Sequence, residues 1–122
     1  MTDPDTLRLI LRNKDLASLG DAFVNFVYSL ALTRVSNCPR AIKVSDRVLA
    51  EAFRLAGLRD YLGTRVSRKE LANASEALLV EAYRRGVLTI DESVDILCKS
   101  IGGPSAGLPE LVKLAAERIR KA

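Results

Sequence analysis

The sequence predicts an all-α fold, a helical domain of five to six helices that spans residues 1–122 as a single unit. Three observations favour this fold class. Apolar residues recur at helical spacing, capping residues precede the periodic segments, and no segment shows the alternation typical of a strand. The chain of 122 residues is 48% hydrophobic and 28% charged, which suits one hydrophobic core.

The N-terminal part is predicted to form two helices. Pro4 begins a short helix that ends near Arg12. A long helix follows, from about Asp15 to about Val35, and its apolar residues cover nearly the whole circumference. Such a helix is typical of the centre of a bundle. One polar stripe remains on it, formed by Ala17, Asp21, Asn25 and Tyr28.

The middle of the chain is predicted to form a short helix and a connector. Ser36-Asn37-Cys38-Pro39 ends the long helix. Ser45 caps a helix over about 46–56, and Gly57 stops it. The connector over 59–65 has room for a short helical turn.

Capping signals predict the remaining helices. Ser67-Arg68-Lys69-Glu70 has capping-box spacing and predicts a helix that ends near Arg85. Thr89-Ile90-Asp91-Glu92 repeats this spacing and predicts a helix that ends near Ser100. Pro109 is predicted to begin a last helix, which is basic at its end.

The composition restricts the chemistry that the protein can perform. The absence of His excludes Ser-His-Asp triads, Cys-His nucleophiles and His-ligated zinc. Cys38 and Cys98 are isolated, so we expect no thiolate metal site, and the sequence leaves their disulfide state open. The net charge of +4 is compatible with a nucleic-acid partner but does not require one. The acidic first residues and the charges within each apolar run predict a cytoplasmic protein without a membrane partner.

Asp21 is the first candidate functional residue. It lies in the middle of a helix that is otherwise almost wholly apolar. Burying an ionised carboxylate without a partner costs several kcal/mol or more. Two interpretations are equally supported: a structural ion pair or hydrogen bond inside the bundle, and a metal ligand that faces a solvent-filled cavity.

Asn73 and Glu76 form the second candidate site. Their spacing places both on one side of a helix, while Leu71, Leu78 and Ala82 lie on the other side and are predicted to face the core. Taken alone, Glu76 is more simply interpreted as an ordinary exposed glutamate.

Two segments resemble the signature motifs of the ribonuclease III family. Leu16-Ala17-Ser18-Leu19-Gly20-Asp21-Ala22 resembles a motif that usually reads Glu-Phe-Leu-Gly-Asp-Ala, with Ala17 in place of its Glu. Ala72-Asn73-Ala74-Ser75-Glu76-Ala77-Leu78 resembles the motif Ala-Asp-x-x-Glu-Ala-Leu. Residues 44–62 resemble the family's middle helix and the turn after it. The resemblance runs from about Leu16 to Tyr83 and does not extend to the double-stranded-RNA-binding domain of many members.

The resemblance implies a homodimer that binds double-stranded or structured RNA and cleaves it with Mg²⁺ or Mn²⁺. In the family, four carboxylates hold the metal, which activates water and neutralises charge on the phosphoryl oxygens. By position these ligands fall on Ala17, Asp21, Asn73 and Glu76, and an acidic position one turn earlier falls on Lys14. The resemblance therefore assigns catalysis to Asp21 and Glu76, with Asn73 as a neutral third ligand, and predicts weak metal binding.

Further residues are candidates for supporting roles. Asn25 and Glu70 lie one turn from Asp21 and Asn73 and could replace the missing ligands. Arg65, Arg68 and Lys69 cluster at a helix start, where backbone N–H groups also favour phosphate, and are the predicted nucleic-acid contacts. A solvated helix surface is the alternative interpretation of these charges, and we favour it for the second basic group, Arg118, Arg120 and Lys121.

Two alternatives to a nuclease stay open. In the first, the domain keeps the fold but only binds RNA or serves as a dimeric scaffold. In the second, residues 48–79 form the helix-turn-helix of a DNA-binding regulator, with Arg65 to Asn73 at the start of the recognition helix. The long connector from Gly57 to Val66 speaks against the second alternative.

Overall fold

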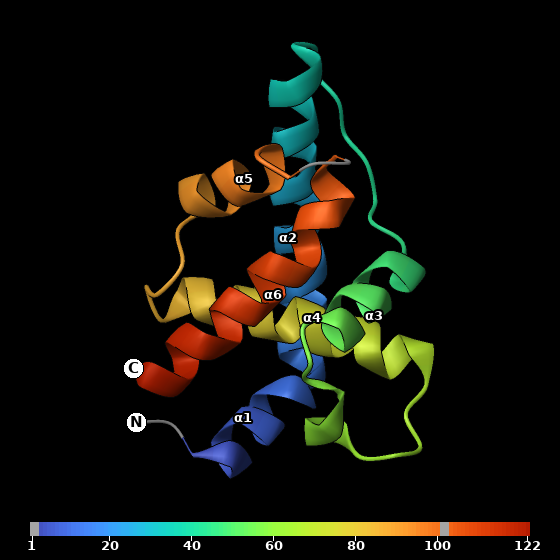
Figure 1. Ribbon diagram of the computed structural model, residues 1–122, viewed down its shortest axis with the longest axis vertical. Coiled ribbons are helices and arrows are strands. Elements are labelled where there is room, and N and C mark those ends of the chain that lie inside the picture. The colour runs from blue at the N-terminus through green and yellow to red at the C-terminus, as the bar shows by residue number, and fades with distance from the viewer. Residues whose placement is uncertain (1–2, 101–102) are drawn as a thin grey trace.

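The computed structural model describes residues 3–100 and 103–122, and it is all-α over these residues (Figure 1). The α-helices are α1 (Pro4–Leu11), α2 (Lys14–Ser36), α3 (Asp46–Leu55), α4 (Arg68–Arg84), α5 (Ile90–Cys98) and α6 (Pro104–Lys121), and a 3₁₀ helix, η1 (Arg59–Leu62), precedes α4. No described residue lies in a strand. The predicted all-α class, the order of the helices and the short turn in the connector are confirmed.

The predicted caps begin the helices, with one difference. Ser67 and Glu70 form a complete capping box at the start of α4. The Thr89 side chain accepts a hydrogen bond from the backbone N–H of Glu92 at the start of α5. The Glu92 carboxylate, however, accepts hydrogen bonds from the guanidinium group of Arg118 on α6, with Nη2 of Arg118 2.7 Å from Oε2 of Glu92. This carboxylate therefore ties two helices together.

The last helix begins at Pro104 and not, as predicted, at Pro109. Gly103 turns the chain with a φ of 98°, and Pro104 then takes the first helical position, where a missing N–H is harmless. Pro109 lies inside α6 and removes one hydrogen bond from it. The flanking Leu108 and Leu111 are buried, and their packing holds the helix together through this position.

α4 is the central helix of the domain. It packs against α1, α2, α3 and α6, and it crosses behind α6 in Figure 1. Its small residues Ala72, Ala74 and Ala77 have no exposed surface, which lets the neighbouring helices approach closely. The hydroxyl of Ser75, also buried, donates to the carbonyl oxygen of Leu49 on α3 at 2.9 Å.

α2 is longer and more apolar than α4 but is buried on one side only. Leu16, Val24 and Val27 are buried, whereas Leu19 and Phe26 are 50% and 54% exposed. By length and composition alone α2 could span a membrane, but its buried side packs against α4 and α5. The prediction that this helix lies at the centre of the bundle is wrong, because apolar composition does not show which side other elements cover.

Both cysteines are free thiols. Cys38 is exposed in the loop after α2. The Sγ of Cys98 donates to the carbonyl oxygen of Ala31 at 3.6 Å. The disulfide that the sequence left open is not formed.

Candidate functional site

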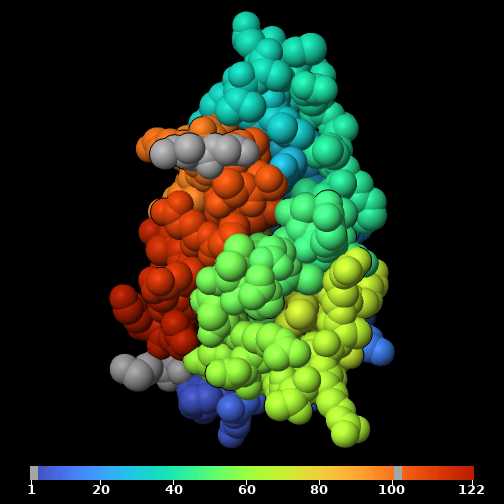
Figure 2. Space-filling view, turned by 45° about the vertical axis from the view of Figure 1, so that its right-hand side comes forward, coloured from blue at the N-terminus to red at the C-terminus, as the bar shows by residue number. Residues whose placement is uncertain are grey.

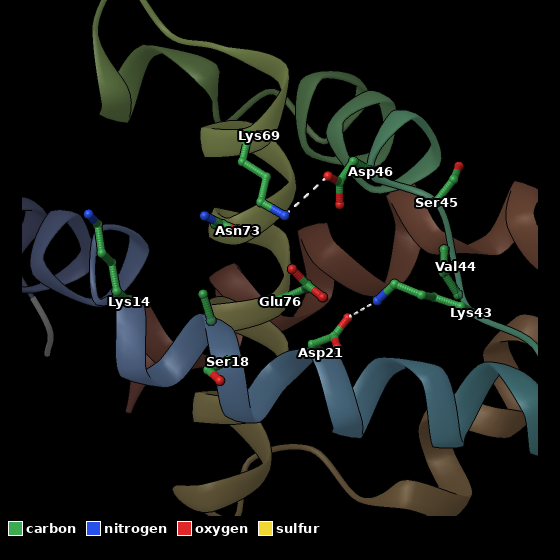
Figure 3. Close-up of a pocket in the computed structure, with 11 residues that line it drawn as sticks. Lys14, Ser18, Asp21, Lys43, Val44, Ser45, Asp46, Lys69, Asn73 and Glu76 are labelled. Atoms are coloured by element: carbon green, nitrogen blue, oxygen red, sulfur yellow. Dashed lines mark hydrogen bonds and ion pairs between the residues drawn. The ribbon is translucent and has the colours of Figure 1, made fainter.

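Gly20 fixes the point at which α2 crosses α4. A Cβ atom added at Gly20 would lie 2.1 Å from the carbonyl oxygen of Glu76, so the two backbones are in direct contact there. Only glycine allows so close an approach. Because Asp21 follows Gly20 in the chain, the crossing places the Asp21 carboxylate beside Glu76 (Figure 3).

The loop over residues 37–45 lies along the polar side of α2. With the end of α2 it forms the narrow upper end of the molecule (Figure 2). Its backbone N–H groups donate to three side chains of α2: Arg40 to Thr33 at 3.0 Å, Ile42 to Ser29 at 3.0 Å, and Val44 to Asn25 at 2.8 Å. The three acceptors are four residues apart, so they lie on one side of α2, and the three donors are every second residue of the loop. These contacts hold the backbone on both sides of Lys43.

α2, this loop and the starts of α3 and α4 surround a hollow of about 630 Å³. All but two of the residues that line it are of polar or charged type: Lys14, Ser18, Asp21, Lys43, Ser45, Asp46, Lys69, Asn73 and Glu76, with Ala17 and Val44 as the exceptions. The structure therefore brings together Asp21, Asn73 and Glu76, as the sequence predicts, and Lys14 borders the same hollow (Figure 3). Ala17 also lines it.

The two carboxylates differ in burial, and Glu76 is buried although its motif taken alone suggested an exposed glutamate. The Asp21 side chain is 45% exposed, while Glu76 is 5% exposed. The hollow opens beside Asp21, which agrees with one of the two interpretations that the sequence left open for this residue. Glu76 is buried because it projects from the central helix at the crossing with α2.

The burial difference separates the pKa values of the pair. Burial is the main cause that raises the pKa of Glu76 to about 8, and the hydrogen bond and charge of Asp21 raise it further. The pKa of Asp21 is lowered, first by the hydrogen bond from the Lys43 ammonium group, whose Nζ lies 2.8 Å from Oδ1 of Asp21. Near neutral pH the pair therefore holds one proton and one negative charge, and Lys43 neutralises that charge.

The two predicted auxiliary ligands are used for other purposes. The Asn25 side chain donates to Asp21 at 3.3 Å and accepts the backbone N–H of Val44, so its carbonyl oxygen is already bound. The Glu70 carboxylate closes the capping box with Ser67 and does not line the hollow. Backbone donors close in the chain or in the adjoining loop thus take an oxygen of each side chain, and the metal-ligand role stays a prediction for both.

The predicted nucleic-acid contacts divide into two groups. Lys69 lines the hollow, and its Nζ lies 3.3 Å from Oδ2 of Asp46. Arg65 and Arg68 are exposed beside it but do not line the hollow. Sequence reasoning missed Asp46 and Lys43, since neither is part of a motif. The sequence held one signal for Lys43. Asn25, Ser29 and Thr33 form a polar repeat on α2, and this repeat is the surface along which the loop that carries Lys43 is bound.

The helix-turn-helix alternative is wrong. A recognition helix must expose one side to enter the major groove. α4 is the most deeply buried helix of the domain, with buried residues from Leu71 to Ala82. Its exposed residues lie only at its two ends.

The residues around the hollow do not fit the four-carboxylate metal centre that the resemblance implies. Ala17 offers no oxygen, Asn73 offers only a neutral one, and the ammonium group of Lys43 occupies the Asp21 carboxylate. Mg²⁺ needs hard, preferably anionic oxygen ligands. Within residues 3–100 and 103–122, no group of three or more acidic, His or Cys side chains is arranged to hold a metal ion.

A comparison with protein families agrees with this description. The profile of the family described as Ribonuclease III matches residues 14–110. The matched stretch begins at the first residue of α2 and includes every residue that lines the hollow. It confirms the resemblance carried by the two motifs. None of the curated proteins compared with the chain matches it.

Proposed function

Since the chain belongs to the ribonuclease III family, we propose that it is a homodimeric domain that binds double-stranded RNA without cleaving it by the magnesium-dependent hydrolysis typical of that family. The observation that carries this proposal is the ion pair between Lys43 and Asp21 in a hollow that lacks two of the four family carboxylates. A tethered ammonium group stands where the family's carboxylates would attract a divalent ion.

RNA binding is supported by the charge and the shape of the site. The chain has a net charge of +4, and Lys69, Arg65 and Arg68 are exposed at the start of α4 next to the hollow. Recognition of duplex RNA depends mainly on its A-form shape and on its backbone, not on base edges. Basic side chains around an open hollow suit such contacts.

Dimerisation is supported by the other side of α2. Leu19 and Phe26 are half-exposed, and with Phe23, Val80 and Tyr83 they line an almost wholly apolar groove between α2 and α4. Members of the family form symmetric dimers, so the occupant that we propose for this groove is a second copy of the chain.

Cleavage assays with restored ligands test the catalytic part of the proposal. We expect no product when the wild type is incubated with duplex RNA and Mg²⁺ or Mn²⁺. Ala17→Glu with Asn73→Asp returns the two carboxylates, and Lys43→Ala also removes the competing ammonium group. We expect metal-dependent cleavage in the triple variant and less in the double variant.

Two outcomes would contradict different parts of the proposal: the absence of cleavage by the wild type, and the assignment of the ligand positions. Metal-dependent cleavage by the wild type would overturn the proposal that it does not cut. A folded triple variant that binds RNA and cuts nothing would show that the ligand positions are wrongly assigned. Adding Asp21→Asn to the triple variant is the matched control and should abolish any cleavage gained.

Light scattering coupled to size-exclusion chromatography tests the dimer. We expect the wild type to elute as a dimer and Phe26→Ser to elute as a monomer. Leu55→Ser is the matched control, because Leu55 is 58% exposed on α3, outside the apolar groove. A monomeric wild type at all concentrations would exclude the dimer.

A further inference from the structure

Three lysines from separate segments border the hollow. Lys14 is the first residue of α2, Lys43 lies in the loop before α3, and Lys69 lies in the first turn of α4 (Figure 3). The side chains of Lys43 and Lys69 are 72% and 70% exposed. Lys14 forms no ion pair with any residue of the described chain.

Three helix starts meet at the same place. The first residue of α2, the cap and first residue of α3, and the first turn of α4 all contribute to the lining. The N-terminal end of a helix carries a partial positive charge, which favours anions. These helix dipoles add to the lysine charges, so the field at the hollow is more positive than a count of side chains indicates.

The carboxylates of the hollow do not cancel this charge. Asp21 and Asp46 are each paired with one lysine, which leaves Lys14 in excess. The third carboxyl group, Glu76, is only 5% exposed, so it presents little surface to a ligand in the hollow. The two ion pairs are exposed, and exposed pairs are weak because water competes for both partners. Lys43 and Lys69 can therefore exchange a carboxylate for a stronger phosphate ligand.

We propose that this hollow binds backbone phosphates of RNA directly on Lys14, Lys43 and Lys69, without a bridging divalent cation. The inference rests on the RNA binding proposed above and specifies its chemistry. In the family, the metal connects protein carboxylates to phosphate. In this chain, ammonium groups fixed to the protein would make that connection.

The test compares two variants that remove the same charge. Lys14→Ala/Lys43→Ala/Lys69→Ala empties the hollow of lysines, and Lys99→Ala/Lys113→Ala/Lys121→Ala removes three exposed lysines that do not line it. Fluorescence anisotropy measures binding of a short duplex RNA between about 50 and 200 mM salt, with EDTA or with Mg²⁺ at matched ionic strength. Circular dichroism checks that both variants fold.

We expect the wild type to bind equally well in EDTA and in Mg²⁺. The hollow variant should lose affinity by roughly tenfold or more, and the slope of log affinity against log salt should fall by at least about one. The control variant should lose less affinity. Equal losses in the two variants, unchanged affinity in the hollow variant, or a requirement for Mg²⁺ would each overturn the inference.

A second experiment distinguishes a site for RNA from a site for a small phosphate ion. It also shows whether a negative result contradicts the phosphate site alone or the proposed RNA binding as well. Inorganic phosphate is added in a thermal-unfolding experiment, with chloride at equal ionic strength as the reference. Stabilisation by phosphate that depends on the three lysines, in a protein that binds no RNA, would mean a small-anion site and would overturn both proposals. RNA binding that does not depend on these lysines would overturn only the phosphate site.

Discussion

The two exposed sides of α2 differ in chemistry although one helix carries both. On one side, Asp21 meets Glu76 and Lys43 at the hollow, and polar side chains bind the loop that follows the helix. On the opposite side, Leu19 and Phe26 are exposed in an apolar groove. The buried side, which contains Gly20, lies between them.

This difference shows that the helix serves two separate surfaces. The polar side is organised by contacts within the chain, since Asp21, Asn25 and Ser29 each bind a residue of the loop that follows the helix. The apolar side has no such contacts from the described residues, and a second copy of the chain is the partner that we propose for it. Damage to the first surface should therefore alter stability or RNA binding, whereas damage to the second should alter assembly.

Among the changes that test this comparison, Gly20→Ala should lower the stability of the protein most, because it forces α2 away from α4. The new methyl group would overlap the backbone of Glu76, and backbone cannot move aside as a side chain can. We expect a destabilisation of about 3 kcal/mol or more, which lowers the Tm by about 10 °C or more. Thermal unfolding followed by circular dichroism measures it. Ser18→Ala is the control, at an exposed position of the same helix. Equal Tm values for the two variants would contradict the direct backbone contact between α2 and α4 at Gly20.

Glu76→Gln should have an intermediate effect, and its sign depends on pH. The pKa of Glu76 is about 8 in the folded protein against an ordinary value of 4.5, so the folded state binds more protons between these values. Stability of the wild type should fall as pH rises through this window. Asp21 works in the opposite direction, because its pKa is lowered.

The amide of the Gln variant cannot ionise and should flatten this decline. Above pH 8 we expect the variant to melt about 3–8 °C higher than the wild type, with a smaller difference near pH 5. Tm measured across the pH range checks both points. A wild-type curve that rises from pH 5 to pH 8, in parallel with that of the variant, would be inconsistent with a raised pKa.

Lys43→Ala should have the smallest effect on stability, so it tests whether the polar side of α2 can lose RNA affinity while the fold stays intact. Its ion pair with Asp21 is exposed on both partners, and such pairs contribute about 0–1 kcal/mol. We expect a Tm change of a few degrees at most, together with a clear loss of RNA affinity. A large loss of stability would instead assign Lys43 a structural role. Lys113→Ala provides the reference for removing one exposed lysine.

The sequence predicted the local structure well because local signals set it. The capping box at Ser67 and Glu70, the cap at Thr89 and the apolar repeats mark helix positions through contacts a few residues apart. The error at Pro109 has the same origin. A proline has the same local preference at either position, and the turn at Gly103 together with core packing decided between the two.

The ordered motifs determined by themselves the family and the convergence of Asp21 with Glu76, since the spacing of a motif is preserved by the fold that carries it. Only the tertiary structure decided what meets these two residues. Lys43 reaches Asp21 because a loop is bound along α2 by side chains far from it in the chain. Burial, too, depends on which elements cover a residue, and that depends on packing across the whole domain. The sequence could therefore place the acidic pair, but not the ammonium group beside it or the proton that Glu76 keeps.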